Sequence, residues 1–168
     1  YSHLKPAEQN YYKLSPFFTL IPMWFLARLP EAPAGAVFNV LNALCVAAGL
    51  AAFLGALRPG RALGTGLTAL CVFLALFDLN INGLYGQVTG ILAGCMLAGI
   101  AAYAAGRYAL AGVLLAYAAN VKLFPFVPAL LLCTGLRPRY LYSLLSALAF
   151  FYLAPALVIG WHANLEFH

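Results

Sequence analysis

The sequence predicts an all-α fold, a polytopic bundle of transmembrane helices, and three observations support this prediction. Hydrophobic residues make up 65% of the 168 residues and charged residues only 8%, whereas soluble domains average about 25% charged residues. The apolar residues form runs with lengths near the roughly 20 residues that cross a bilayer. Most basic residues stand at the ends of these runs, as cytoplasmic anchors do. A soluble enzyme, a disordered tail and a nucleic-acid-binding protein are therefore excluded.

The beginning of the chain is expected to lie at the outer face of the membrane. Residues 1–15 are polar and aromatic and lack the apolar core and cleavage site of a signal peptide. Because the chain opens with Tyr1 rather than Met, we expect it to be a fragment of a longer protein. A short apolar helix is predicted over residues 16–29, with Pro16 in its first turn. Pro22 lies inside this helix and is expected to kink it.

Four further apolar runs are predicted to be membrane spans within one integral-membrane domain, residues 1–168. A basic turn at residues 58–61 follows the first run, and a polar segment at residues 78–87 follows the second. The third run contains Gly90 and Gly94 in a GxxxG pattern, which predicts close packing against another helix. The predicted spans are residues 34–57, 62–77, 88–106 and 140–160.

Residues 108–136 do not fit a simple span. They are apolar apart from Lys122, but one straight helix of this length would exceed about 40 Å, against a hydrocarbon core of roughly 30 Å. A single crossing would place Arg137 and Arg139 on the opposite side from Arg107. A re-entrant hairpin that turns near Lys122 places all three arginines on one side, as the positive-inside rule favours. We therefore predict a broken helix or re-entrant hairpin, and a kinked, tilted single span is the alternative.

Two charged residues, Asp78 and Lys122, lie within the apolar body of the chain. A charge at the centre of a membrane helix costs about 2.5–3.5 kcal/mol on insertion scales, so each one needs an explanation. Asp78 is either a hydrated helix-end residue, a partner of Lys122, a ligand for a hydroxyl group or a metal ion, or a catalytic base. Lys122 either reaches to the interface, pairs with Asp78, or supplies a point charge for an anionic substrate such as a phosphate.

Further polar side chains follow Asp78 in the segment 78–87. Two glycines in this segment allow the backbone to turn sharply. An ordinary polar loop has the same composition, and the functional interpretation is a hydrogen-bonding wall for a sugar. A hairpin would bring Lys122 to the same half of the membrane, where broken helices line cavities. The side chains of this proposed wall are those of Asn80, Asn82, Tyr85 and Gln87.

The cysteines and histidines do not indicate a metal site. All four cysteines lie singly inside apolar runs without a CxxC pair, which is typical of small buried side chains. The three histidines lie near the ends of the chain without metal-ligand spacing. We therefore predict neither a metal ion nor a cofactor.

Three short segments, in the same order and spacing, resemble segments of glycosyltransferase family 87. Tyr12–Phe17 is similar to its aromatic-x-Tyr-x-Pro segment, and Leu84–Thr89 to its Gly-Gln-Val-Asn segment. Val121–Pro125 is similar to its Lys-x-x-Pro segment. Leu14 stands where the family usually has an aromatic residue, and Thr89 where it usually has Asn.

The resemblance implies a GT-C type fold and a hexosyltransferase, most often a mannosyltransferase, of the cell membrane. Such enzymes move a sugar from a polyprenyl-phosphate donor to a glycolipid or glycan acceptor on the non-cytoplasmic face. Their partners are therefore membrane lipid and these two substrates, without nucleic acid. Lys122 would bind the donor phosphate near Gln87, and Tyr12 and Lys13 are expected to line the same outer cavity. The catalytic acid of the family is expected upstream of Tyr1, outside this chain.

Two other functions are compatible with the residues. A secondary transporter also uses broken helices with isolated charges, but such folds usually contain a repeat, and the segment 78–87 has no counterpart elsewhere. A non-catalytic membrane scaffold predicts that Asp78, Gln87 and Lys122 are all replaceable without loss.

Overall fold

The structure is a computed structural model that describes residues 17–18, 24–57 and 88–162. Within these ranges every regular element is a helix, so the predicted all-α class is confirmed for the described part of the chain. The elements are η2 (Leu26–Arg28), α2 (Glu31–Leu57), α4 (Thr89–Ala104), α5 (Tyr108–Val121), α6 (Phe126–Cys133), α7 (Pro138–Leu153) and α8 (Ala156–Ile159). Of the short helix predicted over residues 16–29, the structure describes Phe17, Phe18 and the 3-10 turn η2. The predicted outer segment 1–15 and the predicted span 62–77 lie outside the described residues.

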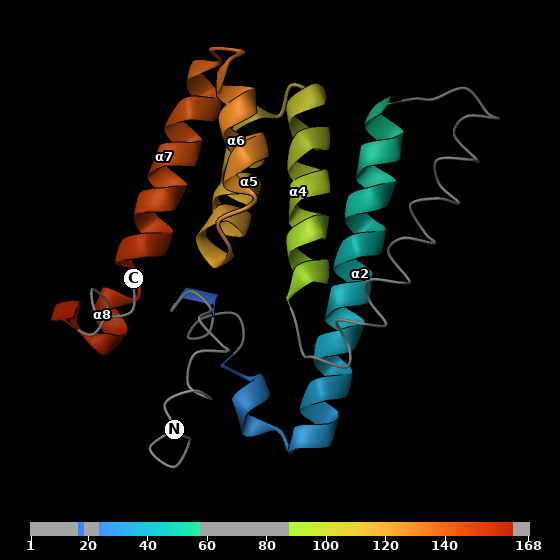
Figure 1. The fold of residues 1–168 in the computed structure, drawn as a ribbon, viewed down its shortest axis with the longest axis vertical. Coiled ribbons are helices and arrows are strands. Elements are labelled where there is room, and N and C mark those ends of the chain that lie inside the picture. The colour runs from blue at the N-terminus through green and yellow to red at the C-terminus, as the bar shows by residue number, and fades with distance from the viewer. Residues whose placement is uncertain (1–16, 19–23, 58–87, 163–168) are drawn as a thin grey trace.

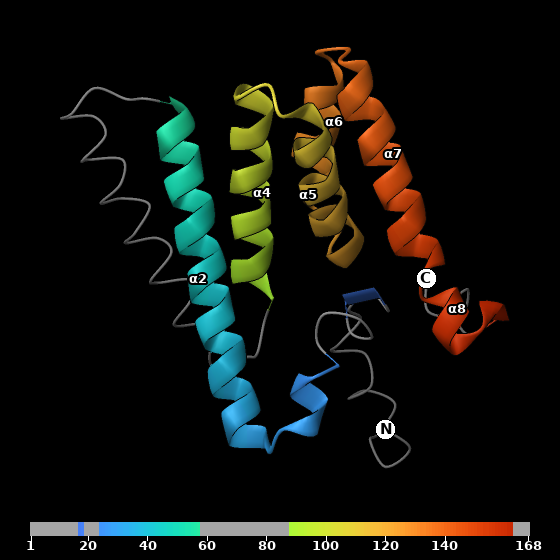
Figure 2. The ribbon, with the colours of Figure 1, turned by 180° about the vertical axis from the view of Figure 1, so that it is seen from behind.

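The long helices form a single row in the order α2, α4, α5 and α7, with α6 lying against α5 (Figure 1). The view from behind shows the same row (Figure 2). Helices α2 and α4 run in the same direction, α5 runs back against α4, and α7 is parallel to α5. The arrangement therefore has two ends, one carrying the starts of α2 and α4 and the other carrying the starts of α5 and α7.

Among the described residues, two helical segments are long and apolar enough to cross a membrane, Ala32–Ala56 and Pro138–Ile159. They coincide in position with the predicted spans 34–57 and 140–160, whose crossing of a membrane stays a prediction. Only 22% and 17% of their most apolar windows are buried inside the protein, which is unlike the core helix of a soluble protein. The shorter apolar helices α4 and α5 have 16 and 14 residues, and α4 lies within the predicted span 88–106.

Close backbone packing joins α2 to α4. A Cβ atom added to Gly90 would lie 2.8 Å from Cβ of Asn42, and one added to Gly94 would collide with the carbonyl group of Cys45. Only glycine leaves room for this approach, as small residues do in membrane helix pairs. The close packing predicted from the GxxxG pattern is therefore confirmed.

The turn from α4 to α5 reverses the chain within three residues. Gly106 has a φ of 74°, in the left-handed region that glycine adopts without strain. Its N–H donates to the Tyr103 carbonyl at 3.0 Å, and the Arg107 N–H donates to the Ala102 carbonyl at 2.8 Å. These are the two hydrogen bonds of a Schellman motif. The motif ends α4 and places Arg107 at the start of α5.

The helical segment between residues 108 and 136 is broken at Lys122. Lys122 is extended, with φ −142° and ψ 150°, and ends α5. Phe124 precedes Pro125, and a residue before a proline disfavours the helical conformation. Helix α5 therefore does not continue through Phe124. Helix α6 then begins at Phe126, and Pro128 occupies a first-turn position where no backbone donor is required.

Two tyrosine hydroxyl groups hold α6 folded back along α5. Tyr103, near the end of α4, donates to the Leu132 carbonyl at 3.1 Å, and Tyr140 of α7 donates to the Ala129 carbonyl at 2.8 Å. The ring of Tyr103 also packs at 5.2 Å, edge to face, on Tyr108 at the start of α5. The end of α6 therefore lies beside the start of α5, so the two helices are antiparallel.

Candidate functional site

Lys122 is the predicted site residue that lies among the described residues. It is the C-cap of α5, and its N–H donates to the Ala118 carbonyl at 3.2 Å. The side chain is partly exposed at the turn between α5 and α6. The other predicted site residues lie outside the described residues, so their positions stay predictions. These are Asp78, Asn80, Asn82, Tyr85, Gln87, Tyr12 and Lys13.

A buried apolar cluster lies directly beside Lys122. We call it the Phe18 cluster, and its buried members come from three parts of the chain. Phe18 is only 2% exposed and shares the cluster with Val88 before α4 and with Val121 at the end of α5. Its members are Phe18, Val88, Ile91, Leu92, Ala118 and Val121.

The Phe18 cluster contains residues that lie within or next to the three segments singled out by their sequence. Phe18 directly follows the segment Tyr12–Phe17, Val88 belongs to Leu84–Thr89, and Val121 opens Val121–Pro125. These three residues are far apart along the chain but share one apolar core. Phe18, the start of α4 and the end of α5 therefore meet at the end of the bundle that carries Lys122.

Aromatic contacts attach Phe17 to α5 and α7. The ring of Phe17 lies 4.6 Å from that of Phe151 and 5.8 Å from that of Phe150, both on α7. It also lies 6.5 Å, edge to face, from the ring of Tyr117 on α5. Each such pair contributes about 0.5–1.5 kcal/mol beyond simple burial. These contacts hold Phe17 near the end of α5 that carries Lys122.

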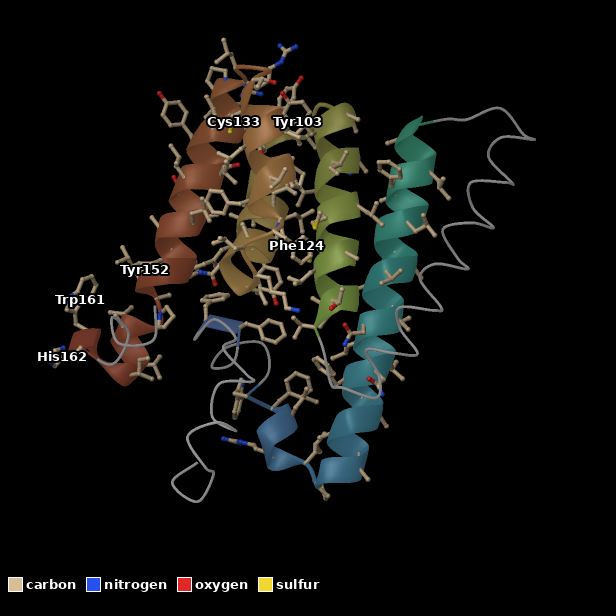
Figure 3. All side chains as sticks on the ribbon, in the orientation of Figure 1. Tyr103, Phe124, Cys133, Tyr152, Trp161 and His162 are labelled. Carbon is tan, nitrogen blue, oxygen red and sulfur yellow. The ribbon has the colours of Figure 1, made fainter. Side chains whose placement is uncertain are left out.

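The residues that follow Lys122 expose apolar side chains. Leu123 is 83% exposed, and Phe124, labelled in Figure 3, also has an exposed ring. Neither side chain belongs to the buried core of the described part of the chain. A cationic side chain next to exposed apolar groups suits a ligand that is itself part anion and part lipid.

The opposite end of the bundle is basic and aromatic. Arg107 is the N-cap of α5, and Arg137 is the N-cap of α7. The guanidinium carbon of Arg137 lies 5.5 Å from the ring centre of Tyr108, in cation–π range. Arg139 follows in the first turn of α7. The three arginines thus share one end of the bundle, which is the grouping required by the hairpin prediction.

A sequence model of glycosyltransferase family 87 matches residues 14–168. The chain belongs to glycosyltransferase family 87. Membership identifies it as a glycosyltransferase whose substrates are a sugar donor and an acceptor, and the apolar helices indicate association with a membrane. Neither the characterised proteins nor the solved structures include a significant match. The matched residues of this family 87 transferase include the Phe18 cluster and Lys122.

Sequence reasoning missed Asn42, which supports the start of α4 in this glycosyltransferase. Asn42 lies in the middle of α2 and is the buried polar side chain of the described core, with 3% exposure. Its Oδ1 accepts the N–H of Ile91 at 3.0 Å, and its Nδ2 donates to the Phe38 carbonyl at 3.0 Å. An asparagine inside an otherwise apolar span was the available signal, because buried amides are normally hydrogen-bonded.

Among the described residues of the transferase, no group of three or more His, Cys, Asp or Glu side chains is placed to hold a metal ion. Cys45, Cys95 and Cys133 are free thiols, each partly buried in a helix. Cys133 and His162 lie at opposite ends of the bundle (Figure 3).

Proposed function

We propose that this glycosyltransferase is a multi-pass enzyme of the cell membrane that transfers a hexose, mannose, from a polyprenyl-phosphate donor. The acceptor is a glycolipid or glycan on the non-cytoplasmic face. The observation that carries this proposal is the Phe18 cluster, in which residues within or next to the three family-like segments share one core beside Lys122. The apolar surface of α2 and of α7 with α8 supports a location within the bilayer.

Lys122 is proposed to bind the phosphate of the donor. Its position at a break between α5 and α6 exposes a cationic group at the end of an apolar helix pair. A polyprenyl-phosphate sugar has the matching composition, an anionic phosphate joined to a long apolar chain. A positive charge at the phosphate is most valuable when the leaving group develops negative charge, so Lys122 would stabilise the transition state.

The proposed transfer inverts the configuration of the sugar. The acceptor hydroxyl oxygen forms a bond to C1 of the sugar while the bond from C1 to the phosphate oxygen breaks. The electron pair of that bond leaves with the donor phosphate, which Lys122 neutralises. The hydroxyl proton passes to a carboxylate base, which we expect outside this chain.

The remaining predicted residues are proposed to bind the sugar and the acceptor. Gln87 immediately precedes Val88 of the Phe18 cluster in the sequence. Its amide and those of Asn80 and Asn82 offer donors and acceptors that suit sugar hydroxyl groups. Asp78 and Tyr85 extend the same proposed surface, and Tyr12 and Lys13 are proposed to line the cavity from the N-terminal segment.

The test is transfer activity of the full-length enzyme with Lys122→Ala. Membranes containing the enzyme receive a radiolabelled polyprenyl-phosphate mannose, and label in the lipid or glycan acceptor is counted. We expect Lys122→Ala to lose about 100-fold or more in transfer, as removal of one transition-state donor does, and Lys122→Arg to retain part of it. Arg139→Ala is the matched control, because it removes a cation from the opposite end of the bundle.

Full activity of Lys122→Ala would contradict the role given to Lys122. A radiolabelled sugar that accumulates inside proteoliposomes, without any transfer to an acceptor, would instead favour a transporter. Family membership supports the transferase over that alternative, and so does the core shared by residues within or next to the three segments.

A further inference from the structure

A groove of about 510 Å³ crosses α2, α4 and α5 near the basic end of the bundle. This volume lies within the range of about 300–1,000 Å³ that is typical of small-molecule sites. Small side chains of α2 and α4 form its floor, including Gly55 and Ala98. Leu114 and Leu110 of α5 and its N-cap Arg107 follow one another at helical spacing along the wall of the groove. The groove therefore runs along the helices and reaches the guanidinium group of the residue that caps α5.

The residues that line the groove indicate which kind of ligand it can bind. Apart from Arg107, the side chains that line it are alanine methyl groups and leucines, which offer no hydrogen bonds to a sugar or a nucleotide. An acyl chain requires only such apolar contact. The exposed guanidinium of Arg107 presents several donors in a plane, which match the oxygen atoms of a phosphate.

The electrostatics of this end also favour an anion. Arg137 and Arg139 lie at the same end as Arg107. Among the described residues the acidic position is Glu31, which begins α2 at the opposite end of the row. The positive charge is therefore not balanced by a described carboxylate, and a basic end of a membrane helix bundle faces the leaflet that carries anionic lipids.

We propose that this groove binds an anionic phospholipid of the cytoplasmic leaflet, with one acyl chain between α2 and α5 and the phosphate on Arg107. The site is separate from the proposed donor site, because the Phe18 cluster and Lys122 lie at the other end of the bundle. It does not depend on the proposed sugar transfer. A lipid bound here would join α2, α4 and α5 at the end where Gly106 turns the chain.

The experiment measures lipid binding to the full-length protein by native mass spectrometry in detergent. The probes are dioleoyl phosphatidylglycerol, dioleoyl phosphatidylcholine and a polyprenyl phosphate. Arg107→Gln removes the charge, and Gly55→Leu fills the groove, since a Cβ at Gly55 meets nothing within 4 Å. Gly35→Leu and Arg139→Gln are the matched controls, because Gly35 is equally open on α2 and neither residue lines the groove.

The expected result is that phosphatidylglycerol binds more tightly than phosphatidylcholine. Arg107→Gln and Gly55→Leu should each weaken phosphatidylglycerol binding about tenfold, the equivalent of one good contact, while both controls bind as the unmodified protein does. Binding of the polyprenyl phosphate should not weaken in these two variants. Equal binding of phosphatidylcholine would overturn the proposal, and so would an equal loss of polyprenyl phosphate binding in both variants. An equal loss in Arg139→Gln would indicate diffuse surface charge and overturn it. Unchanged binding in Gly55→Leu would show that the lipid lies elsewhere and would also overturn it.

Discussion

Asn42 in the middle of α2 caps the first turn of α4 through a hydrogen bond from the Ile91 N–H to its Oδ1, at 3.0 Å. The first backbone donors of a helix have no partner within the helix, and the local N-cap Val88 supplies no side-chain acceptor. A neighbouring helix therefore supplies the cap. The same start of α4 carries Val88 and Ile91 of the Phe18 cluster, so this hydrogen bond positions the candidate site as well as the helix.

Replacement of Asn42 is expected to destabilise the protein. Asn42→Ala removes the acceptor and leaves the Ile91 N–H buried, which costs about 1–2 kcal/mol of the free energy of unfolding. Thermal unfolding in detergent measures the change. Asn39→Ala is the control, because Asn39 lies on the same helix with an exposed side chain. An equal effect of the two substitutions would contradict the cap.

The hydroxyl group of Tyr140 is expected to hold α6 in place. Tyr140→Phe removes its hydrogen bond to the Ala129 carbonyl and keeps the ring, so we expect a loss of about 1 kcal/mol. Hydrogen exchange of the α6 amides should accelerate, while that of α4 should not. Tyr142→Phe is the control, since Tyr142 is 74% exposed. Unchanged protection of α6 in Tyr140→Phe would show that other contacts hold the fold-back.

Gly112 is expected to be irreplaceable in the contact between α5 and α7. A Cβ atom at Gly112 would lie 2.7 Å from the Leu144 nitrogen and 2.9 Å from the Tyr140 carbonyl oxygen. These are backbone atoms, so Gly112→Ala must separate the helices and should cost about 1–3 kcal/mol, as overpacking does. Gly35→Ala meets open space and should be neutral or stabilising by about 0.5–1 kcal/mol. The melting temperatures of Gly112→Ala and Gly35→Ala are compared. Equal values would contradict the tight contact between α5 and α7.

Phe18 is expected to matter for activity as well as stability. Phe18→Ala opens a cavity in the core that residues within or next to the three family-like segments share, and buried Phe→Ala changes cost about 3–5 kcal/mol. We expect reduced sugar transfer even at temperatures where the variant stays folded, because the core that contains Val88 and Val121 is loosened. Leu157→Ala, at a highly exposed position on α8, serves as the control in the same transfer assay. A folded Phe18→Ala variant with full activity would show that the Phe18 cluster does not support the candidate site.

The helical class could be predicted because it depends on local properties. A composition with 8% charged residues cannot solvate a surface, and the lengths of the apolar runs match α2 and α7 with α8. The break at Lys122 was also foreseeable, since prolines and the positions of the arginines limit residues 108–136 to few arrangements. The hydrogen bonds from tyrosines to α6 were not foreseen. A tyrosine in an apolar run gives no sequence signal of whether its hydroxyl group donates to a carbonyl.

The candidate site, like the fold, could be predicted where a local sequence pattern was sufficient but not where it depends on long-range contacts. Lys122 was identifiable by itself, since a lysine in an apolar run is expensive wherever the run folds. Its neighbours were not identifiable in this way, because Phe18, Val88 and Val121 are ordinary apolar residues whose meeting depends on helices that are distant in sequence. The Asn42–Ile91 bond spans 49 positions and follows no periodic pattern. Composition and periodicity indicate which segments are buried in an apolar environment. Which helix packs against which depends on the fit of glycine-lined helix faces, and this fit is decided only in the assembled tertiary structure.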